Sequence, residues 1–168
     1  MTESQTSAAT AEDFRAMMRG FPTGVAVVTA TDLAGQPWGM TCSSVCSVTL
    51  EPPTLLLSLR VGSPTLAAVL ERSHFTLNFL HALGQKTAEL FGSSSGHRFD
   101  HVRWEQPLDA AGPHLFADAH AIADCRVDRH DRFGDHEVVY GQPYRITAHQ
   151  SHRPLLYGQR NFRPWPDP

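Results

Sequence analysis

Small hydroxyl-bearing residues crowd the segment from Gly39 to Pro53, where a strand would be expected to supply apolar side chains to a core. Thr41, Ser43 and Ser44 offer hydroxyl donors and acceptors, and small residues leave the neighbouring backbone N–H groups approachable. This combination suits the polar edge of a planar heterocycle and its phosphate. A Ser- and Thr-rich strand end is more often a turn or an ordinary sheet edge, so this segment alone does not establish a ligand site.

A second candidate site, for an anion, lies at Ser63, where a helix is predicted to begin and to run to Glu71. Ser63 is a favourable N-cap, and Pro64 suits the first helical position. The free N–H groups of a first helical turn attract phosphate, and Arg60 stands just upstream. The alternative interpretation is a well-capped helix that binds no ligand.

The elements that must position these residues are mostly strands. β-Branched and aromatic runs predict strands over residues 25–31, 38–43, 54–59, 75–80, 119–129, 137–148 and 155–157. Short helices are predicted over 12–20, 63–71 and 85–91, and a long loop over 92–112. Mainly antiparallel strands with few helices indicate a closed or partly closed barrel, because closure removes exposed sheet edges.

Further segments flank the hydroxyl-rich stretch: Gly20-Phe-Pro-Thr-Gly-Val-Ala-Val-Val-Thr29 before it, then Gly134-Asp-His-Glu-Val-Val-Tyr-Gly141 and Pro154-Leu-Leu-Tyr-Gly-Gln-Arg160 after it. In this order the motifs resemble the flavin reductase-like domain family, the small reductase components of two-component flavin-dependent monooxygenases. The resemblance runs from about Phe14 to about Phe162, nearly the whole chain. It implies a mainly β fold, an antiparallel split β-barrel of the FMN-binding type with a few short flanking helices.

The resemblance also implies a set of ligand-contacting residues. Those expected at the flavin are Thr41, Cys42, Ser43, Ser44, Ser58, Leu59, Arg60, Ser63, Thr65, Asn78, Phe91, Arg98 and Phe99. His136, Tyr157 and Arg160 are expected at NAD(P)H, where His136 positions the nicotinamide and no other catalytic residue is implied. From the residues alone, Asn78 could equally be a hydrogen-bonded core amide, Phe91 the buried end of a helix, and His136 a surface turn histidine.

The implied activity is that of an NAD(P)H:flavin oxidoreductase, which reduces FAD or FMN and supplies it to a partner monooxygenase. FAD is slightly favoured over FMN, and NADH over NADPH. Direct hydride transfer from nicotinamide C4 to flavin N5 requires two closely stacked rings rather than an acid/base pair. The sequence shows no Ser-His-Asp order, activated cysteine or paired carboxylates, which opposes a hydrolase.

Two alternative functions stay open. The first is a flavin-binding module of the same fold, either non-catalytic or used only for electron transfer. The second is a pyridoxamine-phosphate oxidase-like enzyme, which would need a phosphate-clamping set of Lys and Arg residues, whereas Lys86 is the only lysine. No Gly-x-Gly-x-x-Gly fingerprint is present, so a nicotinamide substrate would bind without a Rossmann unit, and weakly.

Length and charge narrow the class of protein. The 168 residues fit one domain, expected over 11–168 after a disordered tail over 1–10. A net charge of −3 gives no basic footprint for nucleic acid or for an anionic membrane, so neither partner is expected. The first residues lack the pattern of a secretory signal, and we expect a cytoplasmic location.

Cysteines, histidines and apolar strands give three further expectations. The three cysteines form no Cys-x-x-Cys pair, which indicates reduced thiols rather than a disulfide framework. His97 and His101 are four residues apart in a segment without helical pattern, so no metal site is expected. The apolar strands over 25–28 and 155–157 predict a homodimer, and flavin sites of the resembled family lie beside the subunit contact.

Overall fold

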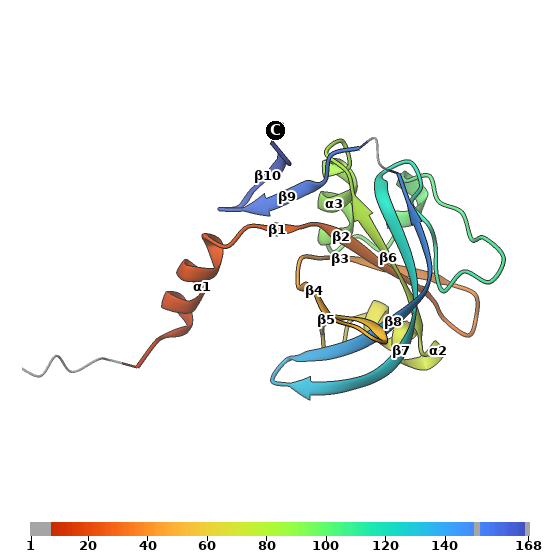
Figure 1. The fold of residues 1–168 in the computed structure, drawn as a ribbon, viewed down its shortest axis with the longest axis horizontal. Helices are drawn as coiled ribbons and strands as arrows, with labels where there is room; N and C mark the ends of the chain where they lie inside the picture. Colours follow the sequence, from red (N-terminus) through yellow and green to blue (C-terminus); the bar gives the residue numbers. More distant parts are fainter. Residues whose placement is uncertain (1–7, 150–151, 167–168) are drawn as a thin grey trace, which may run out of the picture.

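The computed structural model describes residues 8–149 and 152–166, whose strands form two antiparallel sheets (Figure 1). The larger sheet has seven strands in the order β3-β2-β6-β7-β8-β5-β4, and the smaller has three in the order β1-β9-β10. The strands are β1 (Thr23–Gly24), β2 (Ala26–Thr31), β3 (Pro37–Cys42), β4 (Val45–Leu50), β5 (Pro53–Arg60), β6 (His74–Leu80), β7 (Ala119–Phe133), β8 (His136–Ala148), β9 (Leu155–Gly158) and β10 (Asn161–Pro164). The helices are α1 (Ala11–Arg19), α2 (Pro64–Arg72) and α3 (Gln85–Gly92), with a 3₁₀ turn at Arg98–His101.

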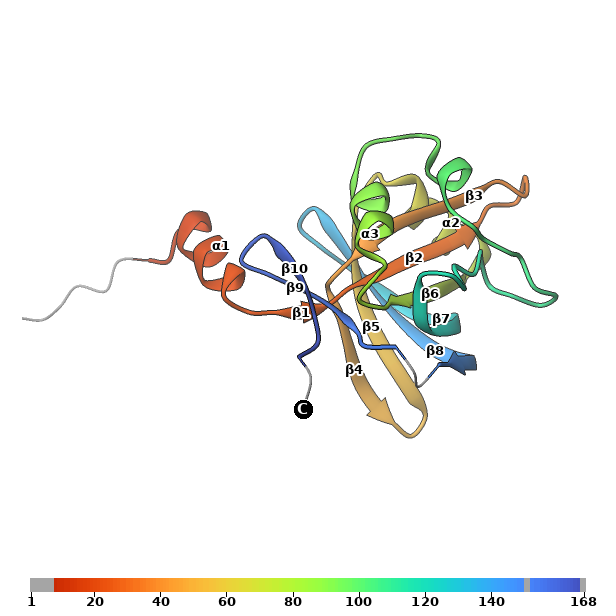
Figure 2. The same ribbon diagram turned by 90° about the horizontal axis from the view of Figure 1, so that it is seen from above.

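The larger sheet curls on itself because its two edge strands are consecutive in the chain. β3 and β4 lie at opposite ends of the strand order, yet only Ser43 and Ser44 separate them. Ser58 N of β5 donates to Ser44 O at 3.2 Å, which extends the β4–β5 ladder to the turn after β3, whereas β3 itself pairs only with β2 among the described strands. The barrel therefore stays open along one seam, between β3 and the β4–β5 pair (Figure 2). The predicted fold class, an antiparallel split barrel with short flanking helices, is confirmed.

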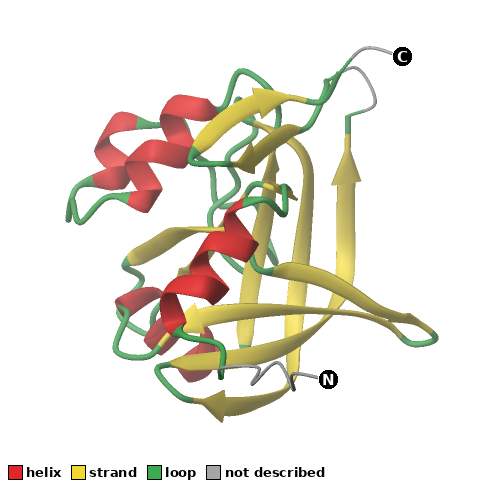
Figure 3. Cartoon of the chain, turned by 90° about the vertical axis from the view of Figure 1, so that its left-hand side faces the viewer, coloured by secondary structure: helices red, strands yellow, loops and turns green. Residues whose placement is uncertain are grey.

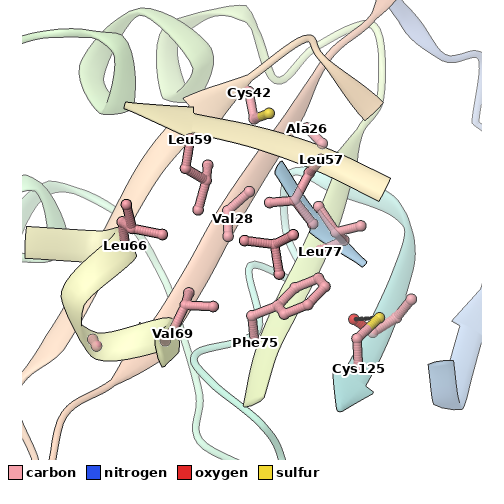
Figure 4. Close-up of a cluster of buried hydrophobic side chains, with 14 residues drawn as sticks. Ala26, Val28, Cys42, Leu57, Leu59, Leu66, Val69, Phe75, Leu77 and Cys125 are labelled. Atoms are coloured by element: carbon pink, nitrogen blue, oxygen red, sulfur yellow. Dashed lines mark hydrogen bonds between the residues drawn. The ribbon is translucent and has the colours of Figure 1, made fainter. Parts of the chain in front are cut away.

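Alternating apolar side chains from β2, β5 and β6 fill the barrel interior (Figure 4). Fully buried members of this cluster include Val28, Leu57, Leu59, Phe75 and Leu77. Helix α2 adds Leu66 and Val69 to the same cluster. Each such side chain contributes about 1.5–3 kcal/mol on burial. Because side chains alternate across a strand, burial of Leu57 and Leu59 directs Ser58 and Arg60 to the outside of the barrel.

Strand β2 is buried on both faces, which explains its unbroken apolar run. Val25 and Val27 lie in a second cluster, outside the barrel, with Phe91 of α3, Leu115 of the following loop and Leu155 of β9. This cluster fixes α3 and the small sheet against the body.

Helix α1 projects from the body (Figure 1), toward the viewer in Figure 3, and none of its residues is buried. Thr10 and Asp13 form a capping box at its start, with Thr10 N 2.9 Å from Asp13 Oδ2. At the other end Arg19 O accepts a hydrogen bond from Gln159 N at 2.8 Å, which joins the helix to the turn between β9 and β10. Within the described residues, no helix has the length and apolar character needed to cross a bilayer.

Strands β1, β4 and β10 were not predicted from sequence. β4 is an exposed edge strand with a register shift between Ser47 and Thr49, so it lacks the alternation that marks a half-buried strand. β10 has only four residues and ends at Pro164. The predicted disordered tail falls mostly on residues 1–7, which lie outside the described residues.

Candidate functional site

The seam of the barrel carries the hydroxyl-rich stretch. Ser43 and Ser44 are exposed there, and Ser44 lies opposite Ser58 through the hydrogen bond that joins β5 to the seam. Ser58 is half-buried, and Arg60, on the same outer face of β5, is exposed. The structure thus brings hydroxyl groups from the Ser43–Ser44 turn and from β5, and one guanidinium group, into one row along the seam.

The end of β5 holds His136 beside this row. Arg60 and His136 are direct cross-strand partners of β5 and β8, so their side chains share one face. His136 Nδ1 lies 2.9 Å from Asp135 Oδ1, and this hydrogen bond lowers the pKa of the Asp135 carboxyl. Val61 N donates to Asp135 O at 2.9 Å, which holds the β7–β8 turn against the end of β5. Since Asp135 fixes Nδ1 as the donor, Nε2 of His136 is available to a ligand.

The start of α2 offers fewer anion donors than the sequence suggested. Ser63 Oγ accepts a hydrogen bond from Leu66 N at 3.2 Å, and Pro64 has no N–H. At most the Thr65 N–H remains free in the first turn, and the Thr65 side chain is buried. A phosphate here would depend on Arg60, on the Thr65 N–H and on the Ser63 O–H, which can donate while Oγ accepts from Leu66 N.

A cavity of about 410 Å³ opens at the other end of the seam, between α1, the Ser43–Ser44 turn and the β9–β10 hairpin. Its lining residues are Met18, Arg19, Phe21, Thr23, Ser43, Ser44, Val45, Cys46, Leu56, Tyr157, Gly158, Gln159 and Arg160. Two residues expected at the flavin, Ser43 and Ser44, thereby meet two expected at the nucleotide, Tyr157 and Arg160. The Tyr157 ring is tilted against Phe162, with ring centroids 4.9 Å apart.

A third group of the predicted site residues lies where α3 and the long loop contact β3. Thr41 Oγ1 donates to Ala88 O of α3 at 2.6 Å, so this hydroxyl already has an acceptor. Phe91 is buried and stacks edge-on against Phe99, with centroids 5.1 Å apart. A Cβ on Gly39 would lie 2.7 Å from the Phe91 ring, which explains why β3 carries glycine there.

Arg98 ties the long loop to β3 and keeps one donor free. Its Nη1 donates to Gly39 O at 2.9 Å, and its Nη2 donates to Ser93 O. Its Nε is buried and has no hydrogen-bond partner among the described residues. A buried N–H without a partner is costly, so a ligand oxygen at Arg98 Nε would satisfy it.

Phe91 and Thr65 have buried side chains, and the side chains of three further residues assigned to the flavin also face the core. Asn78 Nδ2 lies 3.1 Å from Thr29 Oγ1, and Asn78 Oδ1 accepts from Leu115 N at 2.8 Å, so this amide is satisfied within the protein. Cys42 lies in the barrel cluster, where burial raises the pKa of its thiol. Leu59 is fully buried in the same cluster. Only backbone atoms of Cys42 and Leu59 are left for contact with a ligand.

The cavity includes residues that sequence reasoning missed, above all Arg19 and Gln159. The sequence pattern indicates only that Arg19 is a basic residue in the last turn of a helix. Its neighbour Gln159 follows 140 positions later, so no local pattern joins them. The resemblance pointed only to the adjacent Arg160.

The histidines and cysteines show no metal centre in the part of the chain that the structure describes. No three His, Cys, Asp or Glu side chains there gather closely enough to hold a metal ion. His97 pairs with Asp100 at 3.3 Å on the surface. Cys42 and Cys125 are buried free thiols, and Cys46 is an exposed one.

Comparison with known proteins identifies relatives that share sequence or fold with this protein over most of its length. A family model described as flavin reductase like domain matches residues 18–166. The flavin reductase (NADPH) of Lentzea aerocolonigenes is 49% identical over 156 residues, covering 93% of this chain and 91% of that protein. The NADH:FAD oxidoreductase SgcE6 of Streptomyces globisporus C-1027, solved with NAD and FAD fragments, has a TM-score of 0.85 at 29% identity, with 92% of both chains covered. BorF, the flavin reductase component of a bacterial two-component tryptophan halogenase, has a TM-score of 0.83 at 28% identity, covering 95% of this chain and all of that chain.

Proposed function

Because the chain belongs to the flavin reductase-like domain family, we propose that it is an NAD(P)H:flavin oxidoreductase that supplies reduced FAD or FMN to a partner monooxygenase. One observation carries this proposal. The barrel seam joins a row of flavin-type donors, Ser44, Ser58 and Arg60, to a cavity lined by Tyr157 and Arg160. Two ligands can therefore meet along one continuous surface.

The seam residues fit a flavin. A bound flavin supplies a ring system that accepts a hydride from reduced nicotinamide. The hydroxyl groups of Ser43 and Ser44 and the adjoining backbone can hydrogen-bond the polar edge of the ring. Arg98, with its buried and unpartnered Nε, is suited to a phosphate oxygen, as is the exposed Arg60. Thr41, Cys42, Leu59 and Asn78 contribute as scaffold, since their side chains are engaged elsewhere.

The nucleotide side is formed by the cavity and by His136. A volume of about 410 Å³ lies within the range of small-molecule sites, roughly 300–1,000 Å³. His136, held by Asp135, presents Nε2 at the same end of β5 as Arg60 and can orient a nicotinamide amide. No general acid or base is required, because the protein only has to hold two rings in contact and exclude water between them.

We also infer a homodimer that delivers flavin by diffusion to its monooxygenase. Phe14, Met17 and Phe21 are 59%, 63% and 62% exposed on or next to α1, an unusual surface for an isolated chain. A second copy covering these side chains would bury them beside the seam. The two-component system of BorF supports the separate partner enzyme. The cytoplasmic location expected from sequence stays a prediction.

Steady-state oxidation of NADH and NADPH tests the proposed activity. The purified protein should consume one or both nucleotides at a rate that rises with added FAD or FMN and is negligible without flavin. A protein that binds flavin tightly but oxidises neither nucleotide would instead be a flavin-binding module of the same fold.

A further inference from the structure

Two arginine residues line the cavity at the α1 end of the seam, and their guanidinium groups have no hydrogen-bond or ion-pair partner among the described residues. Arg19 lines the cavity and two adjoining hollows of about 340 and 360 Å³, and Arg160 lines the cavity and the larger of these two. No Asp or Glu lines any of the three spaces. Clustered positive charge without an internal counter-charge is unusual in a chain of net charge −3 and favours an anionic ligand.

The two arginines are held next to each other by the backbone. Gln159 N donates to Arg19 O at 2.8 Å, so the β9–β10 turn docks on the last residue of α1 (Figures 1 and 2). Gln159 and Arg160 both adopt positive φ, at 49° and 62°, which residues with a Cβ rarely do. Asn161 Nδ2 steadies this turn by donating to Gln159 O at 2.8 Å. The pair is thus positioned before any ligand arrives, at the expense of local strain.

The surroundings of the pair indicate which anion it binds. The inner wall of the cavity is apolar and aromatic, with Val45, Leu56 and Tyr157, and suits a planar ring. Arg19 and Arg160 are exposed at its rim, which suits a terminal dianionic phosphate. The flavin phosphate has other candidates, Arg60 and Arg98, in separate parts of the seam. NADPH differs from NADH by one terminal phosphate, on the adenosine 2′ oxygen, and arginine is the usual residue that accommodates it.

Resting on the proposed reductase function, we propose that Arg19 and Arg160 together bind the 2′-phosphate of NADPH, so that this protein prefers NADPH to NADH. This revises the preference for NADH expected from sequence. The 2′-phosphate occupies the rim, and the rest of the nucleotide extends along the seam toward His136. The pyrophosphate, which NADPH and NADH share, is the alternative ligand of these two arginines. The experiment below distinguishes the two assignments.

Charge-removing variants measured with both nucleotides test the assignment. We would compare wild type with Arg19→Gln and Arg160→Asn, since asparagine tolerates positive φ. Arg103→Gln is the matched control, because Arg103 is an exposed arginine that lines a separate hollow with Trp104 and Glu105. Each of the two rim variants should lower kcat/KM for NADPH about 10- to 100-fold, the effect of losing a charge-assisted hydrogen bond. kcat/KM for NADH and the flavin Kd should stay within about twofold, and the control should match wild type.

A binding measurement keeps the inference separate from the reductase activity. By calorimetry, adenosine 2′,5′-bisphosphate should bind wild type at least about tenfold more tightly than adenosine 5′-monophosphate, and both rim variants should lose this difference. Equal losses for NADPH and NADH would place the pyrophosphate at the arginines, and a loss of flavin affinity would place the flavin phosphate there; either overturns the assignment. If the protein reduces flavin but does not favour the bisphosphate, this inference fails and the proposed function stands. If it favours the bisphosphate through both arginines but reduces no flavin, the proposed function fails alone.

Discussion

Replacing Asp124 with asparagine should destabilise the protein by an amount that depends on pH. The Asp124 side chain, on β7, is 1% exposed and accepts hydrogen bonds from groups on β6, on β8 and on the loop that follows α3. These donors are Thr76 Oγ1 at 2.6 Å, Ala111 N at 3.0 Å, His114 Nε2 at 2.9 Å and Arg145 Nε at 2.6 Å. The carboxylate therefore joins β6, β7 and β8 to the loop that follows α3.

The magnitude follows from the pKa of Asp124. Burial alone would raise this pKa, but the four hydrogen-bonding partners, led by His114, outweigh it and lower the pKa from 3.8 to about 2. At ~1.4 kcal/mol per tenfold change in acid dissociation, ionised Asp124 adds roughly 2–3 kcal/mol to the free energy of unfolding. Because the folded pKa lies below the unfolded one, this contribution is present above about pH 4 and disappears as the pH falls toward about 2.

Urea denaturation of wild type and Asp124→Asn at several pH values measures the effect. The variant should lose roughly 2–3 kcal/mol near neutral pH, and about half of that difference should remain near pH 3. Asp131→Asn is the control, since Asp131 is 66% exposed and 3.8 Å from Arg129, and an exposed pair contributes about 0–1 kcal/mol. Equal free energies of unfolding for wild type and Asp124→Asn at neutral pH would contradict this prediction. So would a difference in the free energy of unfolding that stays constant down to about pH 3.

Three further predictions concern the site and the assembly. His136→Ala should raise the KM for the nucleotide or slow hydride transfer, at about 1–3 kcal/mol of transition-state stabilisation, because the ring beside Arg60 orients the nicotinamide. Stopped-flow kinetics and flavin titration check this, and a variant that loses flavin with normal nucleotide kinetics contradicts it. Arg98→Gln should weaken flavin binding about tenfold or more, because the unpartnered Nε would no longer meet a phosphate oxygen. Fluorescence titration of the folded variant measures this, and unchanged flavin affinity would place the phosphate elsewhere. Light scattering at micromolar concentration should give the mass of two chains, because a second copy would bury the exposed apolar side chains on and next to α1. A measured mass of one chain would rule out the dimer.

The barrel and its seam could be predicted because the deciding patterns are local. The apolar run ending in Leu57 and Leu59 predicts a buried strand, and the serines of the seam interrupt the apolar pattern where the sheet opens. Edge strand β4 escaped prediction because neither of its faces is buried, so no alternation is selected. The order of the motifs along the chain indicated the flavin reductase-like domain family, and the family match over residues 18–166 agrees with that prediction.

The role of individual polar residues could not be read from the sequence, because their partners are distant in the chain. Asn78 is satisfied by Leu115, 37 residues away, and by Thr29, 49 residues away. Ser63, a predicted phosphate ligand, also caps α2 by accepting from Leu66 N, and a sequence cannot show whether its O–H donates to a ligand as well. The role proposed for Arg19 depends on the docking of the β9–β10 turn, at Gln159, on the end of α1.

Anaerobic stopped-flow mixing of the flavin-loaded protein with NADPH, and separately with NADH, measures hydride transfer to the bound flavin. Protein-bound flavin should lose its oxidised absorbance much faster than free flavin mixed with the same nucleotide, with NADPH as the faster reductant. If the wild-type protein binds flavin but either nucleotide reduces it no faster than it reduces free flavin, the protein is not a flavin reductase.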